Sequence, residues 1–382
     1  MDKNTGENFF INRVKKLRER LRKQDVDCMT VFKDENIYYL TGFYAKDSGS
    51  IIILQKREIY LLVHFIYREQ AKKTVMLKKI KIVEYVKKRD EKYKEIISSE
   101  RGKIAGIEGS SISYDDYMSN KKILSGLGWK IKNLSSFIEE ARKVKDQYEI
   151  TSVKKACKIS DDSVKDILKM DFSTISGFSE KKLALHIEAG MLDRNSDGRS
   201  FDLIVASNTA SSLPHYISSG KIIKSGCLLL DIGCIFNKYC SDITRTVFTG
   251  NSLSGSLKAK NIDKLKKIYD IVLQAQLRSL ESCREGISCT ELDKVARDYI
   301  SGMGYGEYFG HGLGHGVGLE VHESPKVTPS KDMLLEENMI ITIEPGIYLE
   351  GIGGVRIEDM VIVKKNGCEN LYSSPKELTV IG

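Results

Sequence analysis

The stretch His311-Gly-Leu-Gly-His315-Gly-Val-Gly-Leu-Glu-Val-His322-Glu323 holds three of the six histidines of this chain. Glycine occupies every second position from 310 to 318, and each glycine in a helix interior costs about 1 kcal/mol relative to alanine. This density disfavours a zinc-protease helix with histidines four residues apart. An extended segment would place His311 and His315 on one face. His322 lies at an odd offset, so a bulge or turn must intervene if all three imidazoles converge.

Two aspartates lie in an apolar stretch upstream that is predicted to form a hairpin. If Asn237-Lys238 is its two-residue turn, residues whose numbers sum to 475 lie opposite one another. Asp242 then faces Gly233, Asp231 faces Thr244, and the two aspartates are diagonal neighbours about 7–8 Å apart. We expect the glycine to leave the space between them open. An aspartate within so apolar a strand is costly to bury without a counter-charge.

Two further acids accompany apolar strands. Glu344 follows the run 339–343, and Glu358 lies in the predicted strand 354–363, where Arg356 would share its face. Each acid alone could be a strand-end charge or a salt-bridge partner. Four such acids together with the histidine stretch indicate a metal centre that is rich in oxygen ligands, which suits manganese, with cobalt, iron or zinc as alternatives. Two bridging carboxylates would hold a pair of ions about 3.5–4 Å apart for hydrolysis.

Composition bounds the class of protein. A chain of 382 residues with 41% hydrophobic and 29% charged residues is typical of a globular protein with more than one domain. The net charge of +8 comes from lysines spread among glutamates, which favours a solvated surface over nucleic-acid binding. The eight cysteines form no Cys-x-x-Cys pair and are expected to be reduced. With a polar N-terminus and no apolar run near twenty residues, the sequence predicts a cytoplasmic protein without membrane contact.

Apolar periodicity predicts two domains, 1–138 and 139–382. The first should be a small α/β domain without a ligand cluster, in which Lys56-Arg57 turns one hairpin. The second should be an α+β domain with helices on one face of a curved sheet. The predicted helices cover 9–24, 145–164, 179–195, 261–283 and 290–303, and the predicted strands cover 28–32, 50–54, 58–63, 103–108, 129–133, 201–206, 227–236, 239–249, 339–348 and 354–363.

Taken in order, the motifs of the second domain resemble those of the pita-bread metallopeptidases, in the branch of Xaa-Pro aminopeptidases and Xaa-Pro dipeptidases (prolidases). The motifs that carry the resemblance are Pro214-His215, Leu230-Asp231-Ile-Gly, Ser241-Asp242-Ile-Thr-Arg-Thr, His311 to Glu323, Ile343-Glu344-Pro-Gly and Val355-Arg356-Ile-Glu358-Asp. Residues 1–138 are similar to the creatinase-like N-terminal domain of that branch. The resemblance therefore implies a C-terminal pita-bread catalytic domain and a smaller N-terminal α/β domain.

The resemblance also implies roles for individual residues. The implied ligands of two divalent metal ions are Asp231, Asp242, His315, Glu344 and Glu358, with Asp242 and Glu358 bridging both ions. The implied catalytic residues are Glu344 as proton shuttle, His215 and His322 as substrate contacts that stabilise the oxyanion, and His311 and Arg356 as groups that orient the substrate or the other histidines. Spacing does not choose between His311 and His315 as ligand, whereas motif position favours His315.

The implied activity is release of the N-terminal residue from peptides with proline in second position, with a homodimer expected by analogy. A strict Xaa-Pro dipeptidase is the alternative. A non-catalytic pita-bread binding protein is a third possibility, but it should have lost several ligands and none is lost here. Asn208 replaces a glycine common in relatives, and asparagine tolerates the left-handed backbone expected there. Lys326 stands where some prolidases carry an arginine near the substrate carboxylate. A lysine there could bind a C-terminal carboxylate as a point charge or merely face solvent, and we favour the solvent interpretation.

Overall fold

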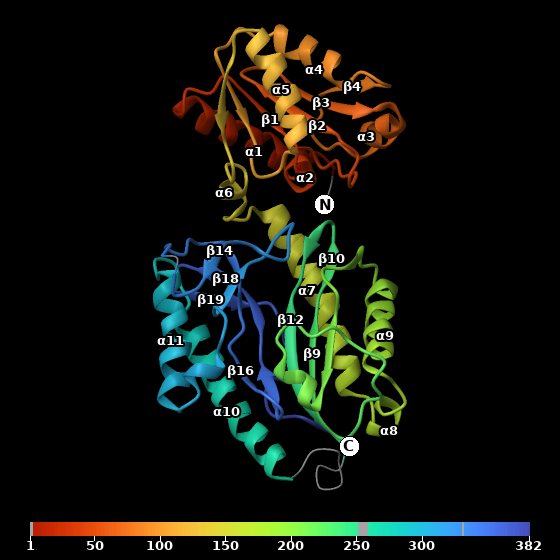
Figure 1. The fold of residues 1–382 in the computed structure, drawn as a ribbon, viewed down its shortest axis with the longest axis vertical. Coiled ribbons are helices and arrows are strands. Elements are labelled where there is room, and N and C mark those ends of the chain that lie inside the picture. The colour runs from red at the N-terminus through yellow and green to blue at the C-terminus, as the bar shows by residue number, and fades with distance from the viewer. Residues whose placement is uncertain (1–2, 251–258, 331) are drawn as a thin grey trace. The chain divides into compact units, whose positions relative to one another are not determined.

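The computed structural model describes residues 3–250, 259–330 and 332–382. Contacts divide the chain into two units, Met1–Arg142 and Lys143–Gly382 (Figure 1). This division falls near the domain boundary that the sequence predicts, between residues 138 and 139. No helix among the described residues is long and apolar enough to cross a membrane.

The N-terminal unit is built on a mixed sheet with the strand order β4-β3-β2-β1-β5-β6. Its elements are α1 (Lys3–Lys23), β1 (Cys28–Val31), α2 (Asp34–Thr41), β2 (Ile51–Gln55), β3 (Ile59–His64), η1 (Phe65–Tyr67), α3 (Arg68–Thr74), β4 (Lys81–Tyr85), α4 (Arg89–Ser98), β5 (Ile104–Ile107), α5 (Tyr114–Gly126), β6 (Lys130–Asn133) and α6 (Glu139–Arg142). The predicted hairpin at Lys56-Arg57 is confirmed, because Leu54 pairs with Ile59 across the turn.

Alternating apolar residues explain how this sheet is covered on both sides. Ile51 and Ile53 belong to a buried cluster with Ile97 of α4 and Leu124 of α5. Ile52, one residue out of phase, is also buried, as are Phe10, Val14, Leu17 and Leu21 of α1. Figure 1 shows α4 and α5 on one side of the sheet and α1 and α2 on the other. The strands are therefore apolar on both faces, as expected for a sheet between two helical layers.

The C-terminal unit combines long helices with mainly antiparallel strands, which confirms the α+β prediction. Its elements are α7 (Gln147–Leu168), α8 (Phe172–Ile175), α9 (Glu180–Asp193), β7 (Gly198–Arg199), β8 (Ile204–Ser207), η2 (Asn208–Ser212), β9 (Gly226–Ile232), β10 (Cys234–Phe236), β11 (Tyr239–Cys240), β12 (Ile243–Thr249), α10 (Ala259–Ser282), α11 (Cys289–Gly302), η3 (Gly306–Tyr308), β13 (Gly314–Gly316), β14 (Glu323–Val327), β15 (Ile340–Ile343), β16 (Gly346–Leu349), β17 (Gly353–Arg356), β18 (Asp359–Lys364), β19 (Gly367–Asn370) and β20 (Val380–Ile381).

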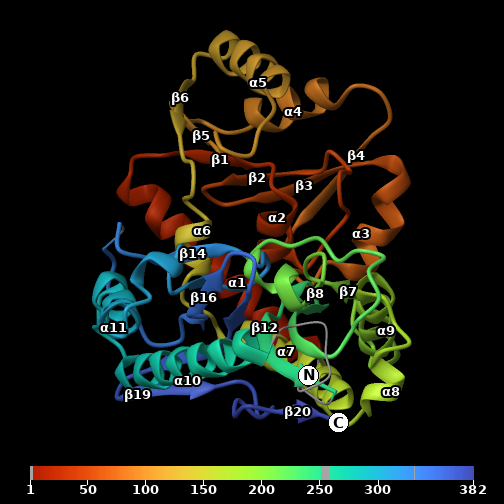
Figure 2. The same ribbon diagram turned by 60° about the horizontal axis from the view of Figure 1, so that its bottom comes forward.

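Four sheets form its strand layer, with the orders β20-β12-β9-β8, β14-β13-β15-β18-β19, β16-β17 and β11-β10-β7. Helix α7 packs against β10, β11 and β12, and α10 packs against β17 and β19. Figure 2 shows α10 and α11 side by side, and their apolar faces share one buried cluster with β15 and β18. Helices α7 and α10 thus support strands whose ends carry the predicted site residues.

Two strands that the sequence predicts as continuous are broken where the site acids occur. The run 339–348 divides at Glu344-Pro345 into β15 and β16, and the run 354–363 divides at Ile357-Glu358 into β17 and β18. In each case the two halves belong to different sheets. The prediction that Arg356 and Glu358 share a face of one strand was therefore wrong, because Glu358 lies in the break between two strands. A proline, which cannot donate to a strand ladder, marks the first break.

A buried acid stands out in the N-terminal unit. Glu108 follows β5 and is only 2% exposed. Its Oε2 accepts hydrogen bonds from the backbone N–H groups of Phe32 (2.7 Å) and Lys33 (3.1 Å), and its Oε1 accepts one from Asn36 (2.6 Å). Burial and the charge of Glu139 raise the pKa of Glu108, and the hydrogen bonds lower it. Burial is the largest effect, and the resulting pKa is about 7. The folded unit consequently favours the protonated acid at mildly acidic pH.

This acid predicts a specific pH dependence of stability. Between pH 4.5 and pH 7 the folded N-terminal unit binds more protons at Glu108 than the unfolded chain does, so its free energy of unfolding falls as the pH rises, by about 3 kcal/mol in total. The only tryptophan of the sequence, Trp129, is buried in this unit and reports its unfolding. Urea titrations followed by Trp129 fluorescence should show the decrease in wild type and a smaller one in Glu108→Gln. Equal pH dependence of the two proteins would contradict the assignment.

Candidate metal centre

All nine residues that the sequence singles out line one cavity of about 590 Å³ in the C-terminal unit. They are His215, Asp231, Asp242, His311, His315, His322, Glu344, Arg356 and Glu358. They come from separate strands and connecting segments between residues 215 and 358. The cavity is therefore the place to test the predicted chemistry.

The two aspartates are placed by the predicted hairpin register. Asn237 and Lys238 have φ values of 49° and 67°, as a two-residue hairpin turn requires. Phe236 pairs with Tyr239, and beyond the turn Asp231 pairs with Thr244, so the sum of 475 holds along the hairpin. Regular pairing is interrupted around Gly233 and Asp242, where β9 gives way to β10 and β11 to β12. The predicted register is confirmed, and it carries both carboxylates into the cavity.

The glycine between the aspartates has a different role from the one predicted. A Cβ atom at Gly233 would collide with the carbonyl oxygen of Ser241 and with the Ser200 hydroxyl. The space is thus filled by neighbouring backbone rather than left open. Glycine is needed here because the two strands approach each other closely where their pairing is interrupted.

The histidine stretch is less extended than predicted. Only Gly314–Gly316 forms a strand, β13, and its pairing with β14 is irregular between His315 and Gly316. This irregularity and the connection to β14 supply the predicted bulge or turn, and the His315 and His322 rings lie 4.4 Å apart in a T-shaped arrangement. His311 lies outside the strand but lines the same cavity. All three imidazoles therefore converge, although not by alternation along one strand.

Hydrogen bonding distinguishes the two histidines that spacing could not. The Nε2 atom of His311 lies 2.9 Å from the Tyr348 hydroxyl, which occupies it. Nδ1 of His315 bonds to the Gly316 carbonyl oxygen (3.1 Å), while its Nε2 faces Glu344 Oε1 (3.3 Å) and Asp242 Oδ2 (3.7 Å). A ring nitrogen fixed by a backbone carbonyl leaves the other nitrogen directed at a metal in many protein sites. This geometry favours His315 as the ligand.

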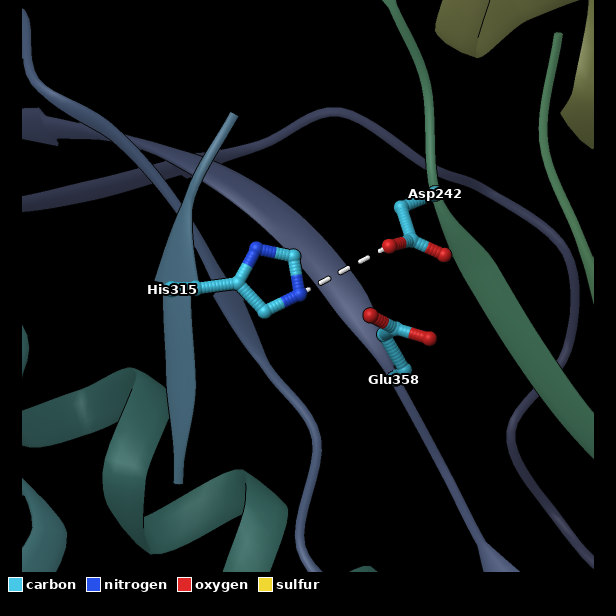
Figure 3. A group of neighbouring side chains, drawn as sticks. All are labelled: Asp242, His315 and Glu358. Atoms are coloured by element: carbon cyan, nitrogen blue, oxygen red, sulfur yellow. Dashed lines mark ion pairs between the residues drawn. The ribbon is translucent and has the colours of Figure 1, made fainter. Parts of the chain in front are cut away.

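Asp242, His315 and Glu358 form the tightest group of ligand atoms. One ligand atom from each lies within 4.8 Å of the other two. In Figure 3 the imidazole and the two carboxylates point toward a common centre from three different parts of the fold. Glu358 is held there by Thr244, whose hydroxyl donates to Glu358 Oε2 (2.7 Å). The ligand atoms of these three residues are close enough together to hold a divalent ion.

The acids of the site repel one another. Burial first, and then the charges of Glu344 and Asp231, raise the pKa of Glu358 well above its usual value. Burial and the charge of Glu358 do the same for Asp242. Burial alone would raise the pKa of Glu344, but the hydrogen bond and the charge of His315 hold this pKa at about 2. The carboxyl group of Glu344 is therefore ionised. Excess buried carboxylate without matching cations is the electrostatic signature of a metal site.

Arg356 is a buried cation that contacts one of these acids directly. Its Nη2 donates to Asp231 Oδ2 (2.6 Å), its Nε to the Thr244 hydroxyl (3.0 Å) and its Nη1 to the Tyr348 hydroxyl (2.8 Å). Asp231 Oδ1 is buried without a hydrogen-bond partner among the described residues. The guanidinium of Arg356 therefore pairs with only one carboxylate oxygen of Asp231, and the other oxygen is available to an ion.

Three residues of the site were not predicted. Thr244 was expected only as the residue opposite Asp231, and Tyr348 had no signal in the sequence. Glu323 also lines the cavity and forms a buried ion pair with Lys145 (2.8 Å). Its place directly after His322 was the available signal. Tertiary contacts define all three, and no local pattern could have revealed their partners.

Comparison with known proteins assigns the chain to a family. The family model for the metallopeptidase family M24 matches residues 151–365, and that for the creatinase/prolidase N-terminal domain matches residues 13–144. The chain belongs to metallopeptidase family M24. It is an enzyme of the proline-peptidase group with the pita-bread fold.

Individual relatives cover almost the whole chain. An Xaa-Pro dipeptidase of Pyrococcus horikoshii is 38% identical over 96% of this chain and 98% of its own. The structure of an Xaa-Pro dipeptidase from Bacillus anthracis matches with a TM-score of 0.89 and 35% identity, covering 97% of this chain and 99% of that one. An X-Pro aminopeptidase from Thermotoga maritima matches with a TM-score of 0.84 and 32% identity over 96% and 99%. Both domains of these proteins are thus represented here.

The excess of carboxylates predicts that one substitution stabilises the metal-free protein and weakens its stabilisation by manganese. Asp242→Asn should raise the free energy of unfolding of the metal-free protein by about 1–3 kcal/mol, because it removes repulsion between Asp242 and Glu358. The same change should reduce the stabilisation that manganese gives to the wild type. Thermal unfolding in chelator and then in manganese measures both effects.

Asp202 provides the matched control for this substitution. It lines the same cavity, but its side chain is 89% exposed and pairs with Arg199. Asp202→Asn should change neither the metal-free stability nor the response to manganese. A destabilised Asp242→Asn protein that still responds fully to manganese would contradict the interpretation.

Proposed function

We propose that this enzyme is a two-metal exopeptidase that hydrolyses the peptide bond preceding proline. The observation that carries the proposal is the convergence of Asp242, His315 and Glu358 in a cavity that also holds His215 and His322. A cavity lined by a candidate metal-binding group and further imidazoles suits a short peptide whose scissile carbonyl must be polarised.

The proposed ligands of the two ions are Asp231, Asp242, His315, Glu344 and Glu358. The donor set consists of four carboxylates and one imidazole, which suits manganese and also accepts cobalt, iron or zinc. The unpaired buried oxygen of Asp231 supports this assignment. Bound ions would supply Lewis acidity for hydrolysis of the peptide bond.

The remaining polar residues of the cavity act on the substrate in this proposal. Glu344, held ionised by His315, is the group that accepts and returns a proton. His215 and His322 are exposed on the cavity wall, where they can donate hydrogen bonds to the scissile carbonyl oxygen. Burial, with the charges of His315, His215 and Lys326, lowers the pKa of His322, which favours its neutral imidazole. Arg356 and His311 hold Asp231 and Tyr348 in place.

Lys326 bears on the length of the substrate. The interpretation that it only faces solvent is incomplete, because Lys326 is exposed and also lines the cavity. A cation on this wall can bind the C-terminal carboxylate of a dipeptide. Together with the Xaa-Pro dipeptidases among the relatives, it favours a dipeptidase over the aminopeptidase expected from the sequence. Xaa-Pro aminopeptidase is the second candidate, supported by the similarity to the Thermotoga maritima structure.

The proposal is tested by product release from Xaa-Pro and from Xaa-Pro-Yaa-Zaa, assayed in parallel in manganese. A dipeptidase should give the higher kcat/KM with Xaa-Pro, and an aminopeptidase with the longer peptide. Asp242→Asn should abolish either activity if cleavage depends on the metal group. Absence of cleavage of both peptides by metal-loaded wild type would refute the proposed substrate class.

Charge removal at Lys326 tests the carboxylate contact. Lys326→Met should raise KM for Xaa-Pro about tenfold, because a charge-assisted contact is worth roughly 1.5 kcal/mol. KM for the longer peptide should change little, since its carboxylate lies beyond this position. Lys326→Arg, which keeps the charge, is the matched control and should remain close to wild type. Equal increases for both peptide lengths would show that Lys326 does not bind the dipeptide carboxylate.

We further propose that the enzyme works in the cytoplasm. All eight cysteines are free thiols in the structure, which suits a reducing compartment.

The homodimer expected by analogy with relatives stays a prediction, and light scattering of the purified enzyme would test it.

A further inference from the structure

The segment 213–219, which carries His215, has little apolar anchoring. Leu213 is 57% exposed and Ile217 is 85% exposed, and His215 between them is also exposed. Tyr216 and Ser218, which alternate with these residues, are only partly exposed. Burial of apolar side chains therefore cannot set the direction of the His215 ring. Polar contacts of the intervening residues must do so.

Ser218 bonds to the backbone of Val205 and Leu203, whereas Tyr216 and the neighbouring Ser219 both bond to one buried carboxylate, that of Glu180 at the start of α9. Its Oε2 accepts hydrogen bonds from the hydroxyls of Tyr216 (2.7 Å) and Ser219 (2.7 Å) and from the Ser219 backbone N–H (3.3 Å). Its Oε1 accepts from the Ser207 hydroxyl (2.6 Å) and backbone N–H (3.0 Å). Glu180 has no exposed surface. It thus joins both chain segments that flank His215.

The backbone of α9 strengthens the same attachment. The N–H groups of Glu180 and Lys181, which open the helix, donate to the carbonyl oxygens of Lys221 (3.0 Å) and Ser219 (2.9 Å). Helix N-termini have unpaired N–H groups, and here the segment after His215 satisfies two of them. Side chain and backbone of one helical turn therefore bind the same short stretch.

Only a carboxylate suits this position. Burial raises the pKa of Glu180, but hydrogen bonds from Ser207, Tyr216 and Ser219 outweigh it and lower the pKa below its usual value. Five donors point at two oxygens, and an ionised carboxylate can accept at both. A glutamine of the same shape would direct its NH₂ group at one set of donors and lose those bonds.

We propose that Glu180 is a positioning residue for catalysis, which fixes the 213–219 segment so that His215 meets the substrate. The inference rests on the proposed function, because it assumes that His215 contacts the peptide. Glu180 itself does not line the cavity and acts through Tyr216 and Ser219. Loss of the attachment would let the imidazole move, and misplacement of about 1 Å can reduce a rate about 100-fold.

The test is a double-mutant cycle on kcat/KM for Xaa-Pro, with Glu180→Gln and His215→Ala alone and combined. We expect Glu180→Gln to lower kcat/KM at least tenfold in the wild-type background and to have little further effect when His215 is absent. Manganese affinity, measured by calorimetry, should stay at the wild-type value. Tyr216→Phe removes one of the five donors to Glu180 and should give a smaller loss in the same direction.

Glu188 provides the matched control. It lies on the same helix, but it pairs with Arg199 at the surface (3.0 Å), so Glu188→Gln should leave kcat/KM unchanged. Equal losses from Glu180→Gln with and without His215 would overturn the positioning role while leaving the proposed function intact. Wild-type kcat/KM in His215→Ala would overturn the role of His215 and the inference with it. A wild-type enzyme that cleaves no Xaa-Pro peptide would refute the proposed function itself.

Discussion

Mutual repulsion of buried carboxylates is the constraint on which the C-terminal unit depends. Asp231, Asp242, Glu344 and Glu358 line one cavity, and among the described residues of its wall Arg356 alone contributes a buried guanidinium. Carboxylates brought together in this way have strongly displaced pKa values and destabilise the fold until protons or cations neutralise them. The surrounding structure must therefore hold the acids rigidly, since they would otherwise move apart.

A second charged cluster behind the site shows how that rigidity is obtained. Arg245 donates to the carbonyl oxygens of Thr244 (2.9 Å) and Glu358 (2.6 Å) and to Asp359 Oδ1 (2.7 Å). Asp359 Oδ2 also receives hydrogen bonds from Gln276, Asn370 and Lys376, and despite burial these cations and donors hold its pKa at about 2. These buried charges are fully paired, in contrast to those of the site. Through the hydrogen bond from Arg245 to the Glu358 carbonyl oxygen, this cluster fixes the backbone between β17 and β18, where Glu358 lies.

The sequence predicted the site through features that are local. The two-residue turn at Asn237-Lys238 determined the hairpin register, and this register placed Asp231 opposite Thr244. Asn208 has the left-handed backbone expected for it, with φ of 55°. The number and types of the acids and histidines were also readable, because buried charge in apolar runs is rare.

What the sequence could not show depends on contacts between distant segments. The breaks at Glu344-Pro345 and Ile357-Glu358 separate strands that have one continuous apolar pattern, and only the assembled sheets distinguish their halves. Spacing alone could not choose between His311 and His315, and the physical reason for the choice is the contact of His311 with Tyr348, a residue that no motif marked. Glu180 resembled an ordinary acid in the first turn of a helix, although the structure makes it the acceptor for five hydrogen-bond donors.

We propose that the excess carboxylates of this cavity bind two divalent ions. Equilibrium dialysis of the purified chain against manganese, followed by elemental analysis, measures the number of ions bound per chain directly. The account predicts two ions for the wild type and fewer for Glu358→Gln, which lacks one of the proposed bridging groups. A wild-type chain that binds no ion at saturating manganese, or a Glu358→Gln chain that binds as many as the wild type, would contradict it.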